Sequence, residues 1–231
     1  MPKASTTAIV KTSRGKNSEP PPSPTQVLIE QAYWDYVLEH GHEPASIFKF
    51  TKDHGWKEEE FYEHFSNFQA IEKSFWRRFT EETAAVVNDD PDAAEYDARQ
   101  KLLAFYYTFF EGMLQHRSKL LSRLPRRIES ARVISGMTDA FGRFSDLVIA
   151  QGRLEGNIAG PSRLDSIYKR GLKLHFLWLI DYYRRDTSDK FEDTDALIEK
   201  SVRFFFDAAR WSVIESAFDL ARFLAPRHNF R

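Results

Sequence analysis

The sequence contains no cysteine and only three methionines among its 231 residues. The absence of cysteine excludes disulfide bonds, thiolate nucleophiles and thiolate metal ligands. The sequence also lacks a run of about 18 uncharged apolar residues, which a membrane-spanning helix requires. No continuous apolar segment typical of a secretory signal lies near the N-terminus. We therefore expect a cytoplasmic protein without a transmembrane segment.

Residue patterns of enzymatic chemistry are missing as well. We find no nucleophile and base at a recognisable spacing, no glycine-rich phosphate loop between a strand and a helix, and no quartet of metal ligands. His40 and His42 flank Gly41 without further ligands at metal-binding spacing. We therefore expect no enzyme, no metal site and no cofactor.

Apolar and aromatic residues, in contrast, are abundant. The apolar fraction of 42% is ample for a core. Apolar residues recur at helical spacing, and no alternating pattern is long enough to form a sheet. The sequence therefore predicts an all-α protein. Outside a helical segment at 46–71, the expected helices cover residues 25–39, 92–114, 127–150, 163–184 and 194–224.

Residues 1–24 are rich in Ser, Thr and Pro, and this composition predicts a disordered arm. Its charged residues are Lys3, Lys11, Arg14, Lys16 and Glu19. A basic arm of this kind either enters the minor groove of DNA beside a helix-turn-helix or acts as a solubilising tail.

Residues 46–71 have the layout of a helix-turn-helix. Ile47, Phe50 and Thr51 share one face of a short helix, and Gly55 lies where a turn needs a positive φ. The apolar faces of the next two helices comprise Phe61, Tyr62, Phe65, Ile71, Phe75, Trp76 and Phe79. The S-x-x-Q sequence from Ser66 to Gln69 predicts a capping box at the start of the third, longer helix.

The segment from Ser46 to Ile71 resembles the N-terminal domain of TetR-like regulators. Ser46 occupies the position of the family's Thr, Gly55 that of its turn glycine, and Tyr62, His64 and Phe65 match its Tyr-x-His-Phe. Further stretches are similar to the branch of this family that is common in Bacteroidota, namely residues 41–50, 61–73, 101–110 and 186–202.

This resemblance implies a TetR-like fold, with a small helix-turn-helix bundle over residues 25–72 and a larger helical domain for ligand binding and dimerisation over residues 73–231. It also implies a homodimer that binds DNA and responds to a hydrophobic or lipid-like small molecule. The candidate DNA-binding residues are Ser46, Lys57, Tyr62 and His64.

The charges of the helix-turn-helix oppose DNA binding. Residues 42–72 contain three lysines against seven acidic residues, a net charge of about −4 on an element that should approach a polyanion. Glu59 and Glu60 lie where many family members have small residues, and Phe68 lies where a phosphate-contacting Lys is common. Acidic residues at a helix N-terminus also have a structural explanation, because they complement the helix dipole.

The aromatic residues of the C-terminal half are candidates for a ligand pocket. The candidates are Phe105, Tyr106, Phe109, Phe110, His175, Trp178, Tyr182 and Phe205. As a set they favour a lipid-like or aromatic ligand over a charged one. Plain core packing explains each of them singly, and a hydrogen-bonded core histidine is the simpler interpretation of His175.

Residues 186–195 look like a bend between two helices, with Ser188 and Thr194 as turn and cap residues and Thr194 opening the last helix. In TetR-like proteins these two helices pair across a dimer. The pairs Arg203–Asp207 and Asp219–Arg222 have the spacing of solvated helix pairs.

Two functions follow from the sequence. In the first, the protein is a dimeric TetR-like transcription regulator that releases DNA when a hydrophobic ligand binds. In the second, the helix-turn-helix no longer binds DNA, and the protein binds a lipid or a protein partner. For the second function, Trp34, Trp56 and Phe68 form either an exposed docking patch or the apolar seam between the first helix and the helix-turn-helix.

Overall fold

The computed structural model describes residues 24–123, 131–210 and 216. Within these ranges the chain forms helices joined by turns, and no strand occurs. The helices are α1 Gln26–His40, α2 Ile47–Asp53, α3 Glu58–Tyr62, α4 Phe68–Asn88, α5 Ala98–Gln115, α6 Arg117–Arg123, α7 Ala131–Leu154, α8 Asp165–Arg185 and α9 Glu192–Arg210, with short 3-10 turns at Ser162–Leu164 and Asp189–Phe191. Residues 1–23 of the predicted arm, the pair Asp219–Arg222 and the end of the last predicted helix lie outside the described residues.

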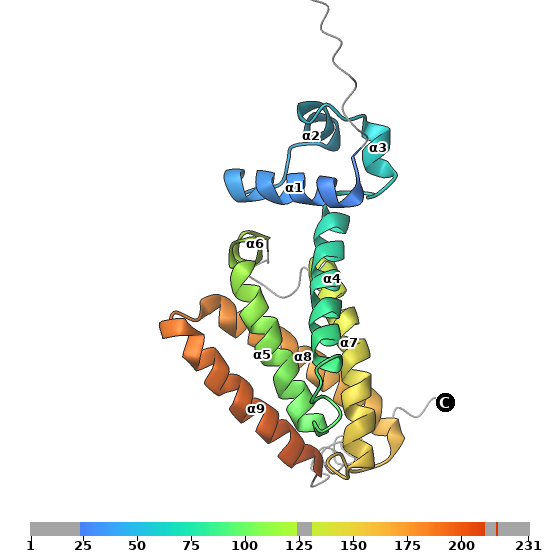
Figure 1. Ribbon diagram of the computed structural model, residues 1–231, viewed down its shortest axis with the longest axis vertical. Helices are drawn as coiled ribbons and strands as arrows, with labels where there is room; N and C mark the ends of the chain where they lie inside the picture. Colours follow the sequence, from blue (N-terminus) through green and yellow to red (C-terminus); the bar gives the residue numbers. More distant parts are fainter. Residues whose placement is uncertain (1–23, 124–130, 211–215, 217–231) are drawn as a thin grey trace, which may run out of the picture.

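Helices α1 to α3 form a small bundle at one end of the molecule (Figure 1). Thr25 caps α1, because its side chain accepts a hydrogen bond from the backbone N–H of Leu28. Gly41 ends α1 in the left-handed region at φ 75°, where glycine has no steric cost.

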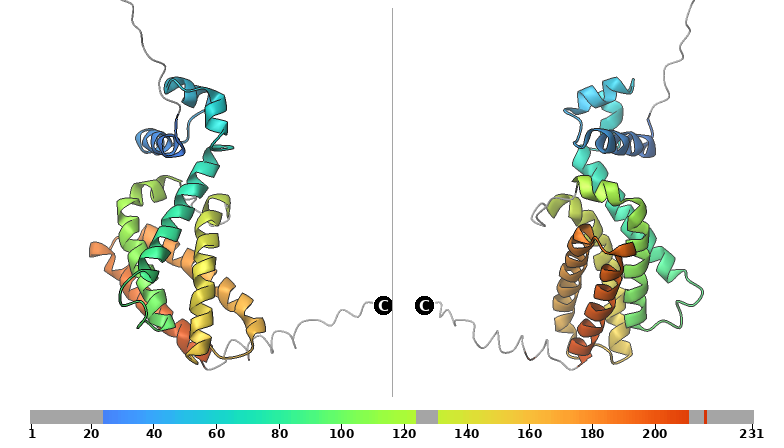
Figure 2. Two further views of the ribbon diagram at one scale, coloured as in Figure 1. Left: turned by 45° about the vertical axis from the view of Figure 1, so that its right-hand side comes forward. Right: turned by 90° about the vertical axis from the view of Figure 1, so that its left-hand side faces the viewer.

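Helix α4 connects this bundle to the rest of the molecule. It begins beside α3 and continues between the other helices, where its main partner is α7 (Figures 1 and 2). The predicted domain boundary at residue 72 therefore falls inside one continuous helix. Any displacement of α4 relative to the other helices moves the end that holds α3.

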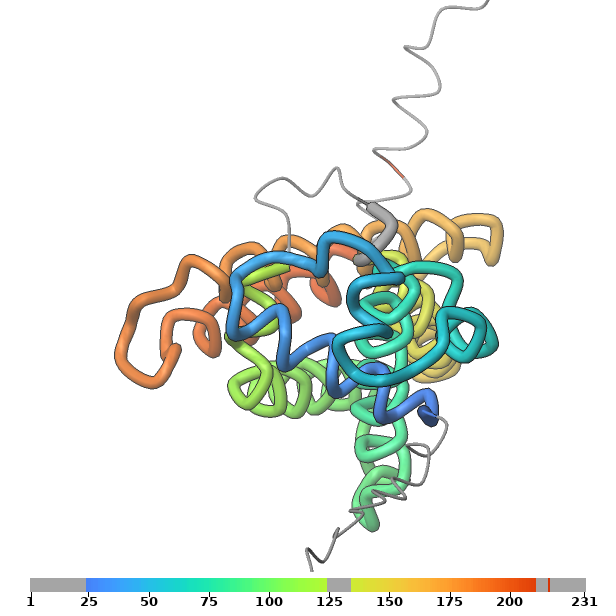
Figure 3. Tube along the Cα trace, turned by 90° about the horizontal axis from the view of Figure 1, so that it is seen from above, coloured from blue at the N-terminus to red at the C-terminus, as the bar shows by residue number. Residues whose placement is uncertain are grey.

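The C-terminal helices α5, α7, α8 and α9 pack together with the lower part of α4, and α8 and α9 lie side by side (Figure 2). Viewed from the N-terminal end, α1 to α3 lie over this bundle (Figure 3). Phenylalanines fill the middle of the bundle, with Phe105 of α5 stacked on Phe144 of α7 at 4.6 Å between ring centroids. Ring stacks of this kind explain why the chain contains so many phenylalanines.

Several expected helix starts are wrong in detail. Helix α4 is capped by Asn67, whose side chain accepts from the N–H of Ala70 at 2.8 Å, and not by Ser66. Helix α5 begins at Ala98 after Asp97, which forms a capping box with Gln100, rather than at residue 92. In both cases a second good cap residue lies close by, and the sequence alone does not decide between them.

The last helix was also expected to start too late. It begins at Glu192, and Thr194 lies buried in its first turn instead of capping it. The carboxylate of Asp186 accepts hydrogen bonds from the N–H and the hydroxyl of Thr194, at 3.0 and 2.5 Å. Its other oxygen accepts from the N–H and the hydroxyl of Ser188. Asp186 is therefore the residue that fixes the bend between α8 and α9.

Candidate functional site

The helix-turn-helix is built around one aromatic cluster. Phe50 of α2, Phe61 of α3 and Phe68 of α4 are buried and contact one another edge to face. Gly55 has φ 74° in the turn between α2 and α3, as predicted. The two short helices therefore hold a fixed mutual orientation, with the outer face of α3 exposed.

The four candidate DNA-binding residues lie on or beside these two helices, and three of them have local partners. Ser46 caps α2 by accepting from the N–H of Lys49 at 3.1 Å. The Tyr62 hydroxyl donates to Glu58 at 3.3 Å, and this side chain is 51% exposed. His64 Nε2 lies 3.1 Å from the backbone oxygen of Pro24. Lys57 is exposed directly before α3.

The acidic residues of α3 do not all serve the same purpose. The carboxylate of Glu60 accepts from the backbone N–H of Lys57 at 2.8 Å, so it caps the helix. Glu58 binds Tyr62, as described above. Glu59 and Glu63 are exposed and leave negative charge on the outer face of the helix-turn-helix. Two of these four glutamates, Glu58 and Glu60, thus have a local structural role.

The predicted docking patch at Trp34, Trp56 and Phe68 is wrong. Trp34 and Phe68 are buried, and Trp56 packs in the turn against Phe50. Trp34 contacts Phe75 and Trp76 of α4 with ring centroids 5.3 and 6.2 Å away. The alternative interpretation, an apolar seam between α1 and the helix-turn-helix, describes these residues.

The junction between the N-terminal helices and the bundle contains a buried charge network that the sequence did not reveal. Glu72 of α4 is fully buried and accepts hydrogen bonds from the Tyr33 hydroxyl of α1 and the Arg123 guanidinium of α6. Arg123 also binds Glu43 at 2.8 Å. Burial, followed by the charge of Glu72, raises the pKa of Tyr33. The position of Glu72 on the apolar face between Ile71 and Phe75 was the available signal.

The predicted ligand-pocket residues separate into two groups. Phe105, Tyr106, Phe109 and Phe110 are buried in the bundle. The rings of Phe141 and Phe176 pack against this group, with Phe141 stacked on Phe176 at 4.4 Å. The middle of the bundle is therefore occupied by side chains.

His175 joins this interior to the surface. Its Nδ1 lies 3.0 Å from the hydroxyl of buried Tyr106, and its Nε2 lies 2.8 Å from the hydroxyl of Ser201 on α9. Because Ser201 also donates to the carbonyl of Leu197 at 2.6 Å, it accepts from Nε2–H, and Nδ1 accepts from Tyr106. Burial lowers the pKa of His175 to about 4. A neutral, hydrogen-bonded imidazole does not have the geometry of a base that activates Ser201.

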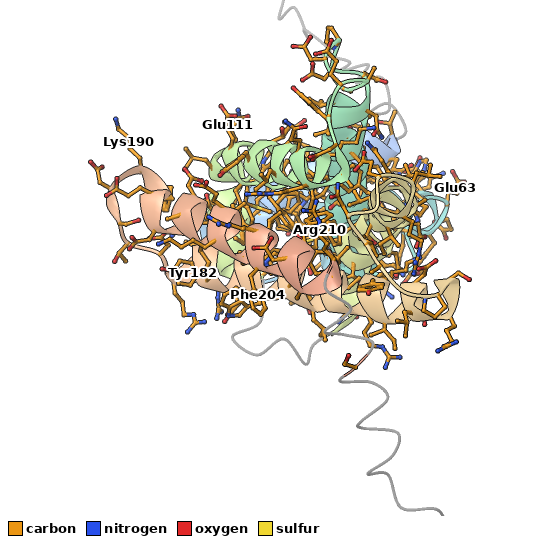
Figure 4. All side chains as sticks on the ribbon, turned by 90° about the horizontal axis from the view of Figure 1, so that it is seen from below. Glu63, Glu111, Tyr182, Lys190, Phe204 and Arg210 are labelled. Atoms are coloured by element: carbon orange, nitrogen blue, oxygen red, sulfur yellow. The ribbon has the colours of Figure 1, made fainter. Side chains whose placement is uncertain are left out.

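The other group lies at the surface of α8 and α9. Trp178 and Phe205, together with His175, line an apolar groove of about 780 Å³ between these helices. Trp178 is 45% exposed and Phe204 on the rim is 73% exposed. Tyr182 lies nearer the bend and lines a separate small hollow beside Asp186. Figure 4 shows Phe204 and Tyr182 along the paired helices α9 and α8.

Comparison with known proteins now gives the family. Residues 101–224 match the model of the tetracyclin repressor-like, C-terminal domain. The chain belongs to this family. The match covers the bundle from α5 onward, whereas the helix-turn-helix lies before it. The resemblance to TetR-like proteins and the all-α TetR-like fold are thus confirmed.

A solved structure has a similar fold. A protein of unknown function from Rhodococcus sp. RHA1 shares 15% identity and a TM-score of 0.51, over 83% of this chain and 100% of that chain. No curated protein matches the sequence. In the part of the chain that the structure describes, no helix is long and apolar enough to cross a membrane. In the same ranges, no cluster of three or more His, Asp or Glu residues is placed to hold a metal ion.

Proposed function

We propose that this member of the tetracyclin repressor-like family is a homodimeric transcription regulator that binds DNA through α2 and α3 and responds to a hydrophobic ligand. The observation that carries the proposal is the intact helix-turn-helix, which is held by the Phe50–Phe61–Phe68 cluster with α3 exposed. A helix-turn-helix reads DNA by inserting its second helix into the major groove. Tyr62 and Lys57 are the exposed donors that would reach phosphate.

The face of α8 and α9 supports the proposed homodimer. The apolar groove of about 780 Å³ has the exposed side chains of Trp178 and Phe204 on it, and a contiguous exposed apolar surface commonly marks an interaction site. A second copy of the same face would cover it, because a two-fold interface places each patch on its own equivalent. Two helix-turn-helix units would then contact half-sites about one helical turn apart.

Helix α4 supports the proposed response to a ligand. It holds the start of the helix-turn-helix at Phe68 and packs against α7 over its remaining length. A ligand that displaces α4 relative to α7 would change the separation of the two α3 helices in the dimer. The loss of DNA affinity can be no larger than the ratio of the ligand's affinities for the protein with α4 displaced and with α4 in its original position.

A DNA-binding experiment at several salt concentrations tests the proposal. We expect a shift of a fragment from the protein's own upstream region, with affinity falling steeply as salt rises, because released counterions dominate binding. Tyr62→Phe removes one donor and should weaken binding roughly fivefold to tenfold. Tyr96→Phe is the matched control, since its hydroxyl binds Asp90 in the turn before α5. The absence of any shift at low salt, with a folded dimer, would contradict the proposal.

One observation favours a second function without DNA binding. Glu59 and Glu63 are exposed on the face that should approach DNA, and neither has a local role like that of Glu60. This surface suits a basic protein partner better than a polyanion. Under this second proposal the protein binds a lipid or a partner, and native mass spectrometry of the purified protein should detect a co-purified lipid or protein together with no DNA shift.

A further inference from the structure

Helix α6 contacts both the bend between α8 and α9 and the helix-turn-helix end of the molecule. It lies between α1 and the end of α5 (Figure 1). It follows α5 after a single residue, His116, whose φ of −113° and ψ of 12° lie outside the helical range. Helix α6 is therefore a separate short element rather than a last turn of α5.

The composition of α6 indicates that polar contacts hold it in place. Its sequence, RSKLLSR, contains three cationic residues and no acidic residue, and Leu120 is the buried residue of this helix. Charge-assisted hydrogen bonds from a guanidinium are directional, so they fix the orientation of a helix more specifically than apolar contact does.

Arg117, at the start of α6, holds the bend between α8 and α9. Its guanidinium donates to the backbone oxygens of Tyr183 and Asp186, at 2.9 and 3.2 Å. It also lies 4.6 and 4.4 Å from the ring centroids of Tyr183 and Phe191. The two carbonyls belong to the last turn and the C-cap of α8, where a cation also complements the helix dipole. Arg117 therefore fixes α6 to the bend.

The rest of α6 is fixed to the helix-turn-helix end. Arg123, its last residue, binds buried Glu72 of α4 and, at 2.8 Å, Glu43 in the segment between α1 and α2. The ammonium group of Lys119 lies 5.4 Å from the ring centroid of Trp34 on α1. The seven residues of α6 thus span about 10 Å between the bend and the helix-turn-helix bundle.

We propose that α6 is a rigid connector through which the position of the α8–α9 bend sets the orientation of the helix-turn-helix. A displacement of the bend acts through Arg117 and Arg123 on the segment between α1 and α2, in addition to any movement of α4. A helix transmits such a displacement because its backbone hydrogen bonds keep its length fixed. The use of the connector in regulation rests on the proposed function, because the bend ends the face that pairs in the proposed dimer. The connector itself does not.

Hydrogen exchange of the full-length protein without DNA tests the connector. Arg117→Gln removes the cation that holds the bend. We expect backbone amides to exchange at least about tenfold faster both in the bend and in α1 to α3, because the lost hydrogen bonds are charge-assisted. Amides in the middle of α7 should keep their rates, and this separates the expected result from a general loss of stability.

Arg153→Gln is the matched control. Arg153 binds a backbone oxygen and a carboxylate as well, those of Pro161 and Asp165, at 3.0 and 2.7 Å, but it joins α7 to the start of α8. Exchange should become faster around residues 155–165 and stay unchanged in α1 to α3. Arg117→Lys keeps the charge without the planar fork, so it should show the pattern of Arg117→Gln at smaller size, and it replaces that variant if Arg117→Gln does not fold.

A distance measurement within one chain gives a second readout. Because the chain has no cysteine, Glu59→Cys on α3 and Leu147→Cys on α7 provide two exposed sites for spin labels, and dilution with unlabelled protein suppresses distances between copies. The distance distribution should broaden or shift in Arg117→Gln and stay unchanged in Arg153→Gln.

Unchanged exchange in α1 to α3 or an unchanged distance distribution in Arg117→Gln would overturn the connector, and so would equal effects of Arg153→Gln. These outcomes are independent of DNA binding. The expected changes without any DNA shift would contradict the regulator and leave the connector standing, and a DNA shift with unchanged exchange in Arg117→Gln would do the reverse.

Discussion

The hydroxyl of Tyr33 on α1 donates a hydrogen bond to the fully buried carboxylate of Glu72 on α4. The same carboxylate oxygen accepts from Arg123 at the end of α6, so three helices meet at one charge. The junction between the helix-turn-helix end and the bundle is therefore held by a polar network as well as by the Trp34 seam. A buried network of this kind favours one mutual orientation of its helices because partial pairing is costly.

Removing Arg123 should destabilise the protein strongly. Arg123→Ala leaves the Glu72 carboxylate buried without its cation, and we expect a loss on the order of 3 kcal/mol in the free energy of unfolding. Urea denaturation measures it. Arg143→Ala is the control, because the Arg143–Glu81 pair is exposed on both sides and should contribute less than about 1 kcal/mol. If the two substitutions lower the free energy of unfolding equally, the buried network contributes no more to stability than an exposed ion pair.

His175 should make stability depend on pH. Burial lowers its pKa from 6.5 to about 4, so the folded protein keeps the imidazole neutral where the unfolded chain protonates it. The free energy of unfolding should therefore fall as pH decreases from about 6.5 to about 4, by roughly 3 kcal/mol from this group, and level off below. His175→Gln should remove this part of the pH dependence, whereas His40→Gln at the exposed end of α1 should not.

The start of α4 allows a direct test of helix capping. Asn67→Ala removes the acceptor for the N–H of Ala70 and should cost about 1 kcal/mol of stability. Ser66→Ala, one residue earlier, should change stability by no more than a few tenths of a kcal/mol. Thermal or urea unfolding of both variants measures the difference. A larger loss of stability in Ser66→Ala than in Asn67→Ala would instead support the capping box predicted at Ser66.

The proposed dimer should depend on the exposed aromatic residues of α8 and α9. Phe204→Glu places a charge in the apolar groove and should raise the dissociation constant of the dimer at least roughly 30-fold, as expected for a hot-spot residue that contributes ~2 kcal/mol. Sedimentation velocity over a range of concentrations measures it. Leu154→Glu is the control, since Leu154 is even more exposed than Phe204 but lies at the end of α7, outside the groove. A dimer that survives Phe204→Glu unchanged pairs through another face.

Much of the fold follows from local sequence. Apolar spacing located most of the helices, and Gly55 adopts the positive φ value expected of it. Short α6 at Arg117–Arg123 was missed because, unlike the equally short α2, it is not part of a recognisable motif. Helix starts were off by one or two residues at α4 and α9 and by six at α5, where other good cap residues lie close by.

The structure separates residues that the sequence analysis had grouped into one ligand pocket. Sequence grouped His175, Trp178 and the phenylalanines of α5 as one pocket, because all are aromatic and share a domain. In the folded protein Phe105 and Phe109 fill the core, Trp178 faces the groove, and Phe110 borders a small cavity beside the bend between α8 and α9. Which side chains leave space between them depends on how helices distant in sequence pack, and no periodicity encodes that.

By itself, the sequence determined the helical class, the helix-turn-helix layout and the resemblance to the TetR-like family, because these depend on residue spacing within single segments. Only the tertiary structure decided that Glu72 is buried at the junction between α1, α4 and α6 and that Glu60 caps α3. Each of these depends on which groups lie within hydrogen-bond distance in the folded chain. For Glu72, those neighbours are brought together by helix packing rather than by neighbouring positions in the sequence.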